Sequence, residues 1–312
     1  MFLPVLTGPT AVGKTAVALE LVTFFPNLVV ISADSRQIYR YMDIGTAKPT
    51  AEERSRVPHE FVDICNPDEP YSAGKFGKEA RRNVAARKEQ GAFPLVVGGS
   101  GLYIRALVDG LFEGEISDPD VRRRLRKEAE TKGLDSLYKR LRKIDPDSAS
   151  KIHPNDEQRI LRALELIELT GEPRSVFLRR NRQKSPYEPI FIGLTMERSA
   201  LYRRIEARVD QMMARGLVDE VERLRQMGFG PEQQALQTVG YREIFDFLEG
   251  RFPLEEAVRL IKRNTRRFAK RQLTWFRADP RIRWFTLDDT TDLTRLAEEI
   301  ARWIDTFLEK GG

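Results

Sequence analysis

The eight residues Gly8-Pro9-Thr10-Ala11-Val12-Gly13-Lys14-Thr15 decide the fold of this chain. They match the pattern G-x-x-x-x-G-K-[ST], follow a short apolar run at 2–7 and open a segment with helical spacing at 14–25. Glycines let backbone N–H groups converge on phosphate oxygens, and the N-terminus of the following helix adds partial positive charge. The pattern therefore predicts a phosphate-binding loop in which Lys14 reaches the terminal phosphate and Thr15 is the metal ligand, for Mg²⁺.

Two more apolar runs extend this pattern along the chain. Residues 28–32 end at Ala33-Asp34, and residues 94–97 end in Gly98-Gly99-Ser100-Gly101. Continuous apolar runs separated by helical segments are typical of a parallel sheet with helices on both faces. We therefore expect an α/β fold, a P-loop NTPase-like core with a parallel sheet flanked by helices.

The character of the sequence changes near Gly114. Residues 116–189 are helical in pattern and basic, without a convincing strand, and Asn155 is placed to cap a helix that Gly171 ends. Strand-like and helical segments then resume at 190–194, 199–227, 238–248, 254–277 and 282–287, with a last helix to about Leu308. We expect a P-loop core made of residues 1–115 and 190–312, with basic C-terminal helices, and an all-helical insertion domain at 116–189.

The composition excludes several classes of protein. The 312 residues are 41% hydrophobic, which is enough for a packed core. One cysteine, Cys65, excludes an internal disulfide framework, and with two histidines it leaves little for a zinc site. No apolar run reaches about 18 residues, so we expect no membrane span. The N-terminus lacks the features of a signal peptide, so we expect a cytoplasmic protein.

The net charge of +6 is unevenly distributed. Residues 116–189 contain 18 Lys and Arg against 13 Asp and Glu, and residues 259–283 contain ten against one, so the rest of the chain is net acidic. Two basic surfaces on an acidic body indicate binding to a phosphate backbone. In 259–283 we expect the arginines to face that partner and Phe268, Trp275 and Phe276 to lie in the core. The alternative is a solvated basic helix face.

Asp34 is the one carboxylate placed at a strand end in the N-terminal half. A P-loop NTPase that hydrolyses nucleotides usually has a carboxylate ending a hydrophobic strand, but the strand at 94–97 ends in glycines instead. Asp34 could bind a metal, take a proton from a nucleophile or simply cap a turn. The missing second carboxylate favours group transfer from a diphosphate over nucleotide hydrolysis.

Seven motifs occur along the chain in a characteristic order. They are 8–15, 33–39, 43–49, 98–103, 153–156 with Arg159 and Arg162, 239–243, and RRFAKRQLTW at 266–275. Together they resemble the bacterial tRNA dimethylallyltransferases, which isopentenylate an adenosine next to the anticodon. The resemblance covers about residues 3 to 280.

The resemblance implies a specific reaction. A dimethylallyl group passes from dimethylallyl diphosphate to N6 of the adenosine 3′ to the anticodon in tRNA, and diphosphate is released. The target adenine is flipped out of the anticodon loop, because an amine held in a base stack cannot reach the reacting carbon in line. The partners implied are the anticodon stem-loop of tRNA and dimethylallyl diphosphate, and we expect a monomer.

The resemblance also assigns roles to residues of this sequence. Asp34 matches the general base, Thr10 a residue near the diphosphate and the reacting carbon, and Arg208 an arginine that stabilises the departing diphosphate. Residues Gly8 to Thr15 match the site for the donor's diphosphate. The positions that match tRNA contacts are Asp34, Ser35, Arg36, Gln37, Ser100, Arg122, Gln158, Arg159, Ile160, Leu161, Arg162, Thr238, Val239, Gly240, Tyr241, Arg242 and Glu243.

Two other functions use part of the same sequence. A P-loop kinase of a nucleoside or small hydroxyl compound would share residues 8–15 and could use Asp34 as a base, but it does not need the basic insertion or the motif at 266–275. An RNA-binding P-loop switch would bind RNA without forming a covalent product. Tyr103 and Tyr241 could stack on bases or line the core.

Overall fold

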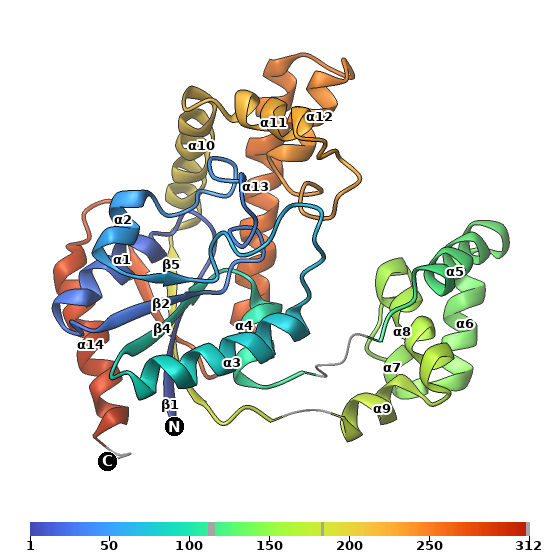
Figure 1. Cartoon of the computed structure of the whole chain (residues 1–312), viewed down its shortest axis with the longest axis horizontal. Helices are drawn as coiled ribbons and strands as arrows, with labels where there is room; N and C mark the ends of the chain where they lie inside the picture. Colours follow the sequence, from blue (N-terminus) through green and yellow to red (C-terminus); the bar gives the residue numbers. More distant parts are fainter. Residues whose placement is uncertain (112–115, 182–183, 310–312) are drawn as a thin grey trace. The chain divides into compact units, whose positions relative to one another are not determined.

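The computed structural model describes residues 1–111, 116–181 and 184–309 (Figure 1). The chain forms two compact units, one made of Met1–Val108 with Ser185–Gly312 and the other of Asp109–Lys184. The second unit begins seven residues before the insertion predicted at 116–189 and ends five residues before its end. Each unit has its own apolar core.

The first unit is built on one six-stranded sheet with the order β3-β2-β4-β1-β5-β6, in which every neighbouring pair is parallel. The strands are β1 (Phe2–Thr7), β2 (Leu28–Ser32), β3 (His59–Glu60), β4 (Phe93–Gly98), β5 (Glu188–Met196) and β6 (Arg283–Leu287). The predicted parallel sheet is confirmed. The chain turns from one side of β1 to the other after β4, and ligands of such sheets bind beyond the carboxyl ends of the strands at this point.

Helices cover both faces of the sheet because its strands are apolar on both sides (Figure 1). In β1, Leu3 and Val5 join one apolar cluster and Leu6 joins the other. The first cluster includes residues of α3 (Ala73–Glu89) and α4 (Gly101–Val108), and the second includes residues of α1 (Lys14–Glu20) and α14 (Leu293–Leu308). The long helix α13 (Leu254–Arg277) contributes residues to both clusters, so it packs against both parts of the core of this unit.

The remaining helices of this unit differ in part from the sequence-based expectation. The single helix predicted at 199–227 is wrong, because Gly216 adopts a left-handed φ of 89° between α10 (Arg198–Ala214) and α11 (Leu217–Gln226). The helix predicted at 14–25 continues past α1 only as a 3₁₀ turn, η1 (Leu21–Thr23). The helix predicted at 238–248 begins three residues late, as α12 (Tyr241–Leu248), and α2 (Ala51–Arg56) is a short surface helix.

The described part of the second unit contains helices and no strand. The helices are α5 (Pro119–Lys132), α6 (Leu134–Ile144), α7 (Pro146–Ala149), α8 (Glu157–Thr170) and α9 (Arg174–Arg180). Gly171 ends α8 as predicted, with φ 73°, but the predicted cap Asn155 is wrong. Asp156 caps the helix instead, because its side chain accepts the N–H of Arg159.

Across residues 1–111, 116–181 and 184–309, no helix combines the length and the apolar character needed to cross a membrane.

Candidate active site

The phosphate-binding loop lies at the carboxyl end of β1, where the chain turns into α1. The backbone of the turn is left-handed at Gly8, Ala11 and Gly13, with φ of 148°, 65° and 108°. A Cβ at Gly8 would lie 2.6 Å from the backbone oxygen of Leu194 on β5, so only glycine fits against the neighbouring strand. The predicted glycine-dependent turn is therefore present at the carboxyl end of β1, and phosphate binding by it stays a prediction.

Lys14 folds back over this loop. Its Nζ donates hydrogen bonds to the carbonyl oxygens of Gly8 at 3.0 Å and Pro9 at 2.8 Å. Burial lowers the pKa of the Lys14 ammonium to about 8, while the charge of Asp34 raises it and that of Arg208 lowers it further. Asp34 follows β2 and Arg208 lies on α10, so charges from two distant parts of the chain act on the Lys14 ammonium.

Arg208 lies on α10 and is half-buried. Burial is the main reason that the pKa of its guanidinium is lowered, and the charge of Glu53 opposes that effect. An arginine keeps its positive charge in spite of such a shift. The site therefore holds a partly desolvated guanidinium whose planar group can bind two oxygens of an anion.

Asp34 follows β2 and closes a tight turn. Its Oδ1 accepts the backbone N–H groups of Arg36 at 2.8 Å and Gln37 at 3.4 Å. Within the described ranges its Oδ2 receives no hydrogen bond. The turn role and the proton-acceptor role considered from the sequence are thus compatible, because each uses a different oxygen of the carboxylate.

The segments on either side of Asp34 are held by distant partners. The N–H of Ser35 donates to Ser100 Oγ at 3.0 Å, and the Arg36 guanidinium donates to the carbonyl oxygen of Gln234 at 2.9 Å. Gln37 donates to the carbonyl oxygen of Ala47 at 3.2 Å. The predicted contact residues 34–37 and Ser100 therefore form one connected surface of the first unit.

The predicted contact segment 238–243 divides into buried and accessible side chains. Tyr241 and Glu243 are 0% and 2% exposed, Gly240 is buried, and Val239 packs against the core. Glu243 accepts the N–H of Gly240 at 2.8 Å and caps α12. The polar side chains of this segment that a macromolecule can reach are Thr238 and Arg242.

Glu220 was not predicted and is central to this region. Its buried carboxylate accepts the N–H groups of Asp43, Ile44 and Gly45 at 3.0, 2.8 and 3.1 Å. It also accepts the Tyr241 hydroxyl at 2.6 Å, and burial together with this carboxylate raises the pKa of that hydroxyl. No local sequence signal marks Glu220, because every partner lies more than 20 positions away.

The predicted contacts of the second unit also centre on a buried carboxylate. Glu165 is 0% exposed and accepts hydrogen bonds from Arg162 at 2.7 Å and Arg122 at 3.0 Å. Burial opposes ionisation of Glu165, but the hydrogen bonds from Arg162 and Arg122 lower its pKa overall. Ile160 and Leu161 are buried in the core of this unit, whereas Gln158 and Arg159 are exposed.

The aromatic residues of the basic helix α13 are only partly as predicted. Phe276 is buried, but Phe268 and Trp275 are 40% and 41% exposed, so the expectation that all three lie in the core is wrong for two of them. Phe268 lies beside an arginine of the same helix, because the Arg271 guanidinium lies 5.8 Å from the centre of the Phe268 ring. Tyr103 is buried, which removes it as a surface for base stacking.

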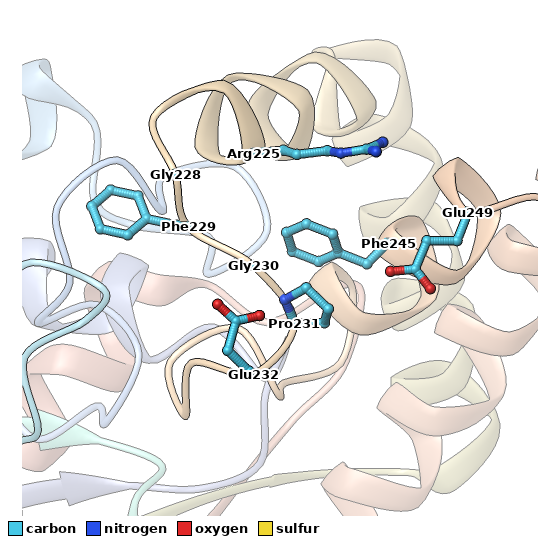
Figure 2. A pocket seen from close by; sticks show the side chains of 8 residues that line it. All are labelled: Arg225, Gly228, Phe229, Gly230, Pro231, Glu232, Phe245 and Glu249. Carbon is cyan, nitrogen blue, oxygen red and sulfur yellow. The ribbon is translucent and has the colours of Figure 1, made fainter.

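A cavity of about 200 Å³ lies apart from these groups, between α11, the following loop and α12 (Figure 2). Phe229, Pro231 and Phe245 line it, with Arg225 and Glu249 at its edges. None of the predicted site residues contributes to its wall.

The fold and the site together define a class of protein, a P-loop α/β protein with an aspartate at the carboxyl end of β2 and a helical insertion. The comparisons with known proteins make the family specific. Residues 37–279 match the model of the IPP transferase family, and the chain belongs to that family.

Its relatives are similar over most of their length. The chain is 53% identical over 287 residues to a tRNA dimethylallyltransferase of Syntrophobacter fumaroxidans, covering 92% of this chain and 84% of the relative. It is 50% identical to that of Carboxydothermus hydrogenoformans, covering 95% of each. Two solved structures are also similar: the tRNA isopentenylpyrophosphate transferase of Bacillus halodurans (44% identity, TM-score 0.74, 99% and 97% covered) and a eukaryotic dimethylallyltransferase acting on tRNA (29%, 0.81, 99% and 79%).

Proposed function

We propose that this protein transfers a dimethylallyl group from dimethylallyl diphosphate to N6 of the adenosine 3′ to the anticodon of tRNA. The observation that carries the proposal is that the loop with Lys14 and the turn with Asp34 follow the carboxyl ends of β1 and β2 in one parallel sheet, where the charges of Asp34 and Arg208 both act on Lys14. Two cations beside an anion-binding loop suit a diphosphate leaving group, and the Asp34 carboxylate suits a base for one proton. The names of the relatives support the same reaction.

In this reaction the N6–C1 bond forms while the bond between C1 and the diphosphate oxygen breaks. The electron pair of the breaking bond stays on the diphosphate, whose growing charge is stabilised by Lys14, Arg208 and the N–H groups of the loop. One such preorganised donor contributes about 3 kcal/mol to a reaction of this kind. The amine loses its proton to Asp34 as the new bond forms, because N6 gains positive charge when it bonds to C1 and its N–H is then far more acidic than that of the neutral amine. Thr10 lies beside the reacting carbon.

A magnesium ion fits this arrangement. Mg²⁺ is commonly held by one or two protein oxygens together with phosphate oxygens, and the Thr15 hydroxyl at the start of α1 is the protein oxygen in this proposal. The described residues contain no group of three or more His, Cys, Asp and Glu side chains suited to a metal. When bound, the ion would neutralise part of the diphosphate charge.

The tRNA is bound through the exposed residues of the predicted contact set and the basic face of α13. Contacts to phosphate oxygens supply affinity, while the connected surface at 34–37 and Ser100 presents the flipped adenine to Asp34. In this proposal the protein acts as a monomer in the cytoplasm. Light scattering tests the oligomeric state, and cell fractionation tests the location.

The decisive experiment measures the mass of the product. Unmodified tRNA incubated with the protein, Mg²⁺ and dimethylallyl diphosphate should gain one five-carbon unit per molecule, located by nuclease digestion at the adenosine 3′ to the anticodon. A gain of phosphate from ATP without the five-carbon unit would support the kinase instead. Tight binding of tRNA with no covalent product would support the RNA-binding switch.

A further inference from the structure

Gln272 of α13 lies between the phosphate-binding loop and the glycine-rich loop that follows β4. Its side chain is buried, with the residue 7% exposed. Its Oε1 accepts the N–H of Thr10 at 2.8 Å, and its Nε2 donates to the carbonyl oxygen of Gly99 at 2.9 Å. An amide is suited to this place because it accepts at one atom and donates at the other within one plane. Gln272 thus joins the two loops although it is 262 positions from Thr10 and 173 positions from Gly99 in the sequence.

The close approach of α13 depends on glycines in the second loop. A Cβ at Gly99 would overlap the Gln272 amide, and a Cβ at Gly101 would overlap the indole of Trp275. Gln272 and Trp275 are three positions apart and share one face of the helix. The side chains of Gln272 and Trp275 therefore pack directly against the backbone of Gly99 and Gly101. The hydrogen bonds of Gln272 form within this close packing.

The glycine-rich loop leads directly to Asp34. Its next residue, Ser100, donates its N–H to the carbonyl oxygen of Ala33 at 3.1 Å and accepts the N–H of Ser35 at its Oγ. Ala33 and Ser35 are the two neighbours of Asp34. A continuous series of covalent and hydrogen bonds therefore runs from Thr10 through Gln272, Gly99 and Ser100 to both sides of the Asp34 carboxylate.

We propose that Gln272 is a positioning residue that sets the distance between the phosphate-binding loop and the Asp34 carboxylate. The inference rests on the proposed function, in which the loop holds the donor and Asp34 faces the amine of the acceptor. Each loop keeps its own substrate contacts without Gln272, but the reacting atoms lose their alignment. Because a misplacement of about 1 Å can cost about 100-fold in rate, the chemical step suffers more than the binding of either substrate.

The experiment measures single-turnover transfer with both substrates saturating, and equilibrium binding of each substrate separately. Gln272→Ala should lower the single-turnover rate by about 10- to 100-fold, while the Kd values for tRNA and for dimethylallyl diphosphate stay within about threefold of wild type. If that variant does not fold, Gln272→Met replaces it, since methionine keeps the volume of the side chain without the amide. An unchanged rate would overturn the proposal, as would a loss confined to binding.

Gln272→Glu separates the two hydrogen bonds. A carboxylate still accepts the N–H of Thr10, but when ionised it repels the Gly99 oxygen, and only when protonated can it donate to that oxygen. The rate of Gln272→Glu relative to wild type should therefore rise as the pH falls, whereas the relative rate of Gln272→Ala should not. Equal pH profiles for the two variants would contradict the role of the Gly99 bond.

Leu273→Ala is the matched control. Leu273 is the next residue of α13, is partly buried and packs against the second apolar cluster, and it has no amide that could join the two loops. This variant should be less stable but should transfer at the wild-type rate at a temperature where it is folded. If it slows as much as Gln272→Ala, Gln272 serves only the stability of the helix. A wild-type protein that transfers no prenyl group would refute the proposed function instead, so the two failures are distinguishable.

Discussion

The phosphate-binding loop and the surface around Asp34 are built in different ways. The loop is a stretch of eight consecutive residues, in which Lys14 bonds to carbonyls only six and five positions away. The surface around Asp34 depends on distant parts of the chain: Arg36 bonds to Gln234, 198 positions away, and Glu220 holds residues 43–45 from 175 to 177 positions away.

This difference separates two kinds of information. The local stretch suffices to bind a phosphate group, whatever that group is attached to, and many unrelated P-loop proteins share it. The distant contacts determine which carboxylate, cation and surface stand beside the phosphate, and these decide the reaction. Changes at Asp34 should therefore affect chemistry most, and changes in the supporting contacts should affect stability or binding by smaller amounts.

The largest effect is expected for Asp34→Asn. Asparagine keeps an Oδ1 that can accept the N–H groups of Arg36 and Gln37, so the turn persists, but it cannot take a proton. The single-turnover rate should fall by about 10²- to 10⁴-fold, with tRNA affinity close to wild type. Equal losses in rate and in tRNA affinity would make Asp34 mainly a binding residue. The residues around Asp34 would then not determine the chemistry separately from binding.

A large effect on stability is expected for Glu220→Gln. The carboxylate serves three backbone N–H groups and the Tyr241 hydroxyl, and an amide places its own N–H against these donors. The free energy of unfolding should fall by about 2–4 kcal/mol. All three tryptophans lie in the first unit, so their fluorescence during denaturant unfolding reports on it.

Glu222→Gln is the control for this change. Glu222 is on the same helix two positions away but is exposed, so the same substitution should change the free energy of unfolding by less than about 0.5 kcal/mol. Similar values for both variants would show that the 43–45 segment does not depend on Glu220.

The same contrast explains what the sequence could predict. The loop at 8–15, the parallel sheet and the helical character of the described insertion were predicted because their signals are local. The helix break at Gly216 was missed because an isolated glycine is tolerated inside many helices. Glu220, Glu165 and Gln272 were missed for a different reason: each is an ordinary polar residue in a helical pattern, and only tertiary contacts with distant segments make it special. The roles of Asp34, Thr10 and Arg208 stay predictions, resting on the resemblance and on their placement.

A smaller effect concerns the pH dependence of Lys14. Its pKa of about 8 applies without ligand, and a bound diphosphate raises the pKa by favouring the charged ammonium. The protonated form binds the anion, so this contribution to affinity is complete well below pH 8 and is lost as the pH rises above it. From pH 7 to pH 9 the affinity for inorganic pyrophosphate should fall by about tenfold relative to Lys14→Arg, whose charge does not titrate in this range. Parallel pH profiles for the two proteins would show that Lys14 is charged throughout.

The smallest effect is expected for Arg242→Ala, which tests the accessible part of the segment at 238–243. Arg242 is exposed, and its partner Glu243, which is buried, keeps the hydrogen bonds from the N–H of Gly240 and the amide of Asn264, so removal of Arg242 should not disturb the fold. If it contacts a phosphate, tRNA affinity should fall by about three- to tenfold at low salt, and the slope of log K against log salt should decrease by about one. Arg225→Ala removes the same charge from an exposed position on α11 outside the predicted contact set and controls for net charge. Equal losses for both variants would mean that tRNA affinity depends only on the overall charge of the protein. The segment at 238–243 would then make no specific contact with tRNA.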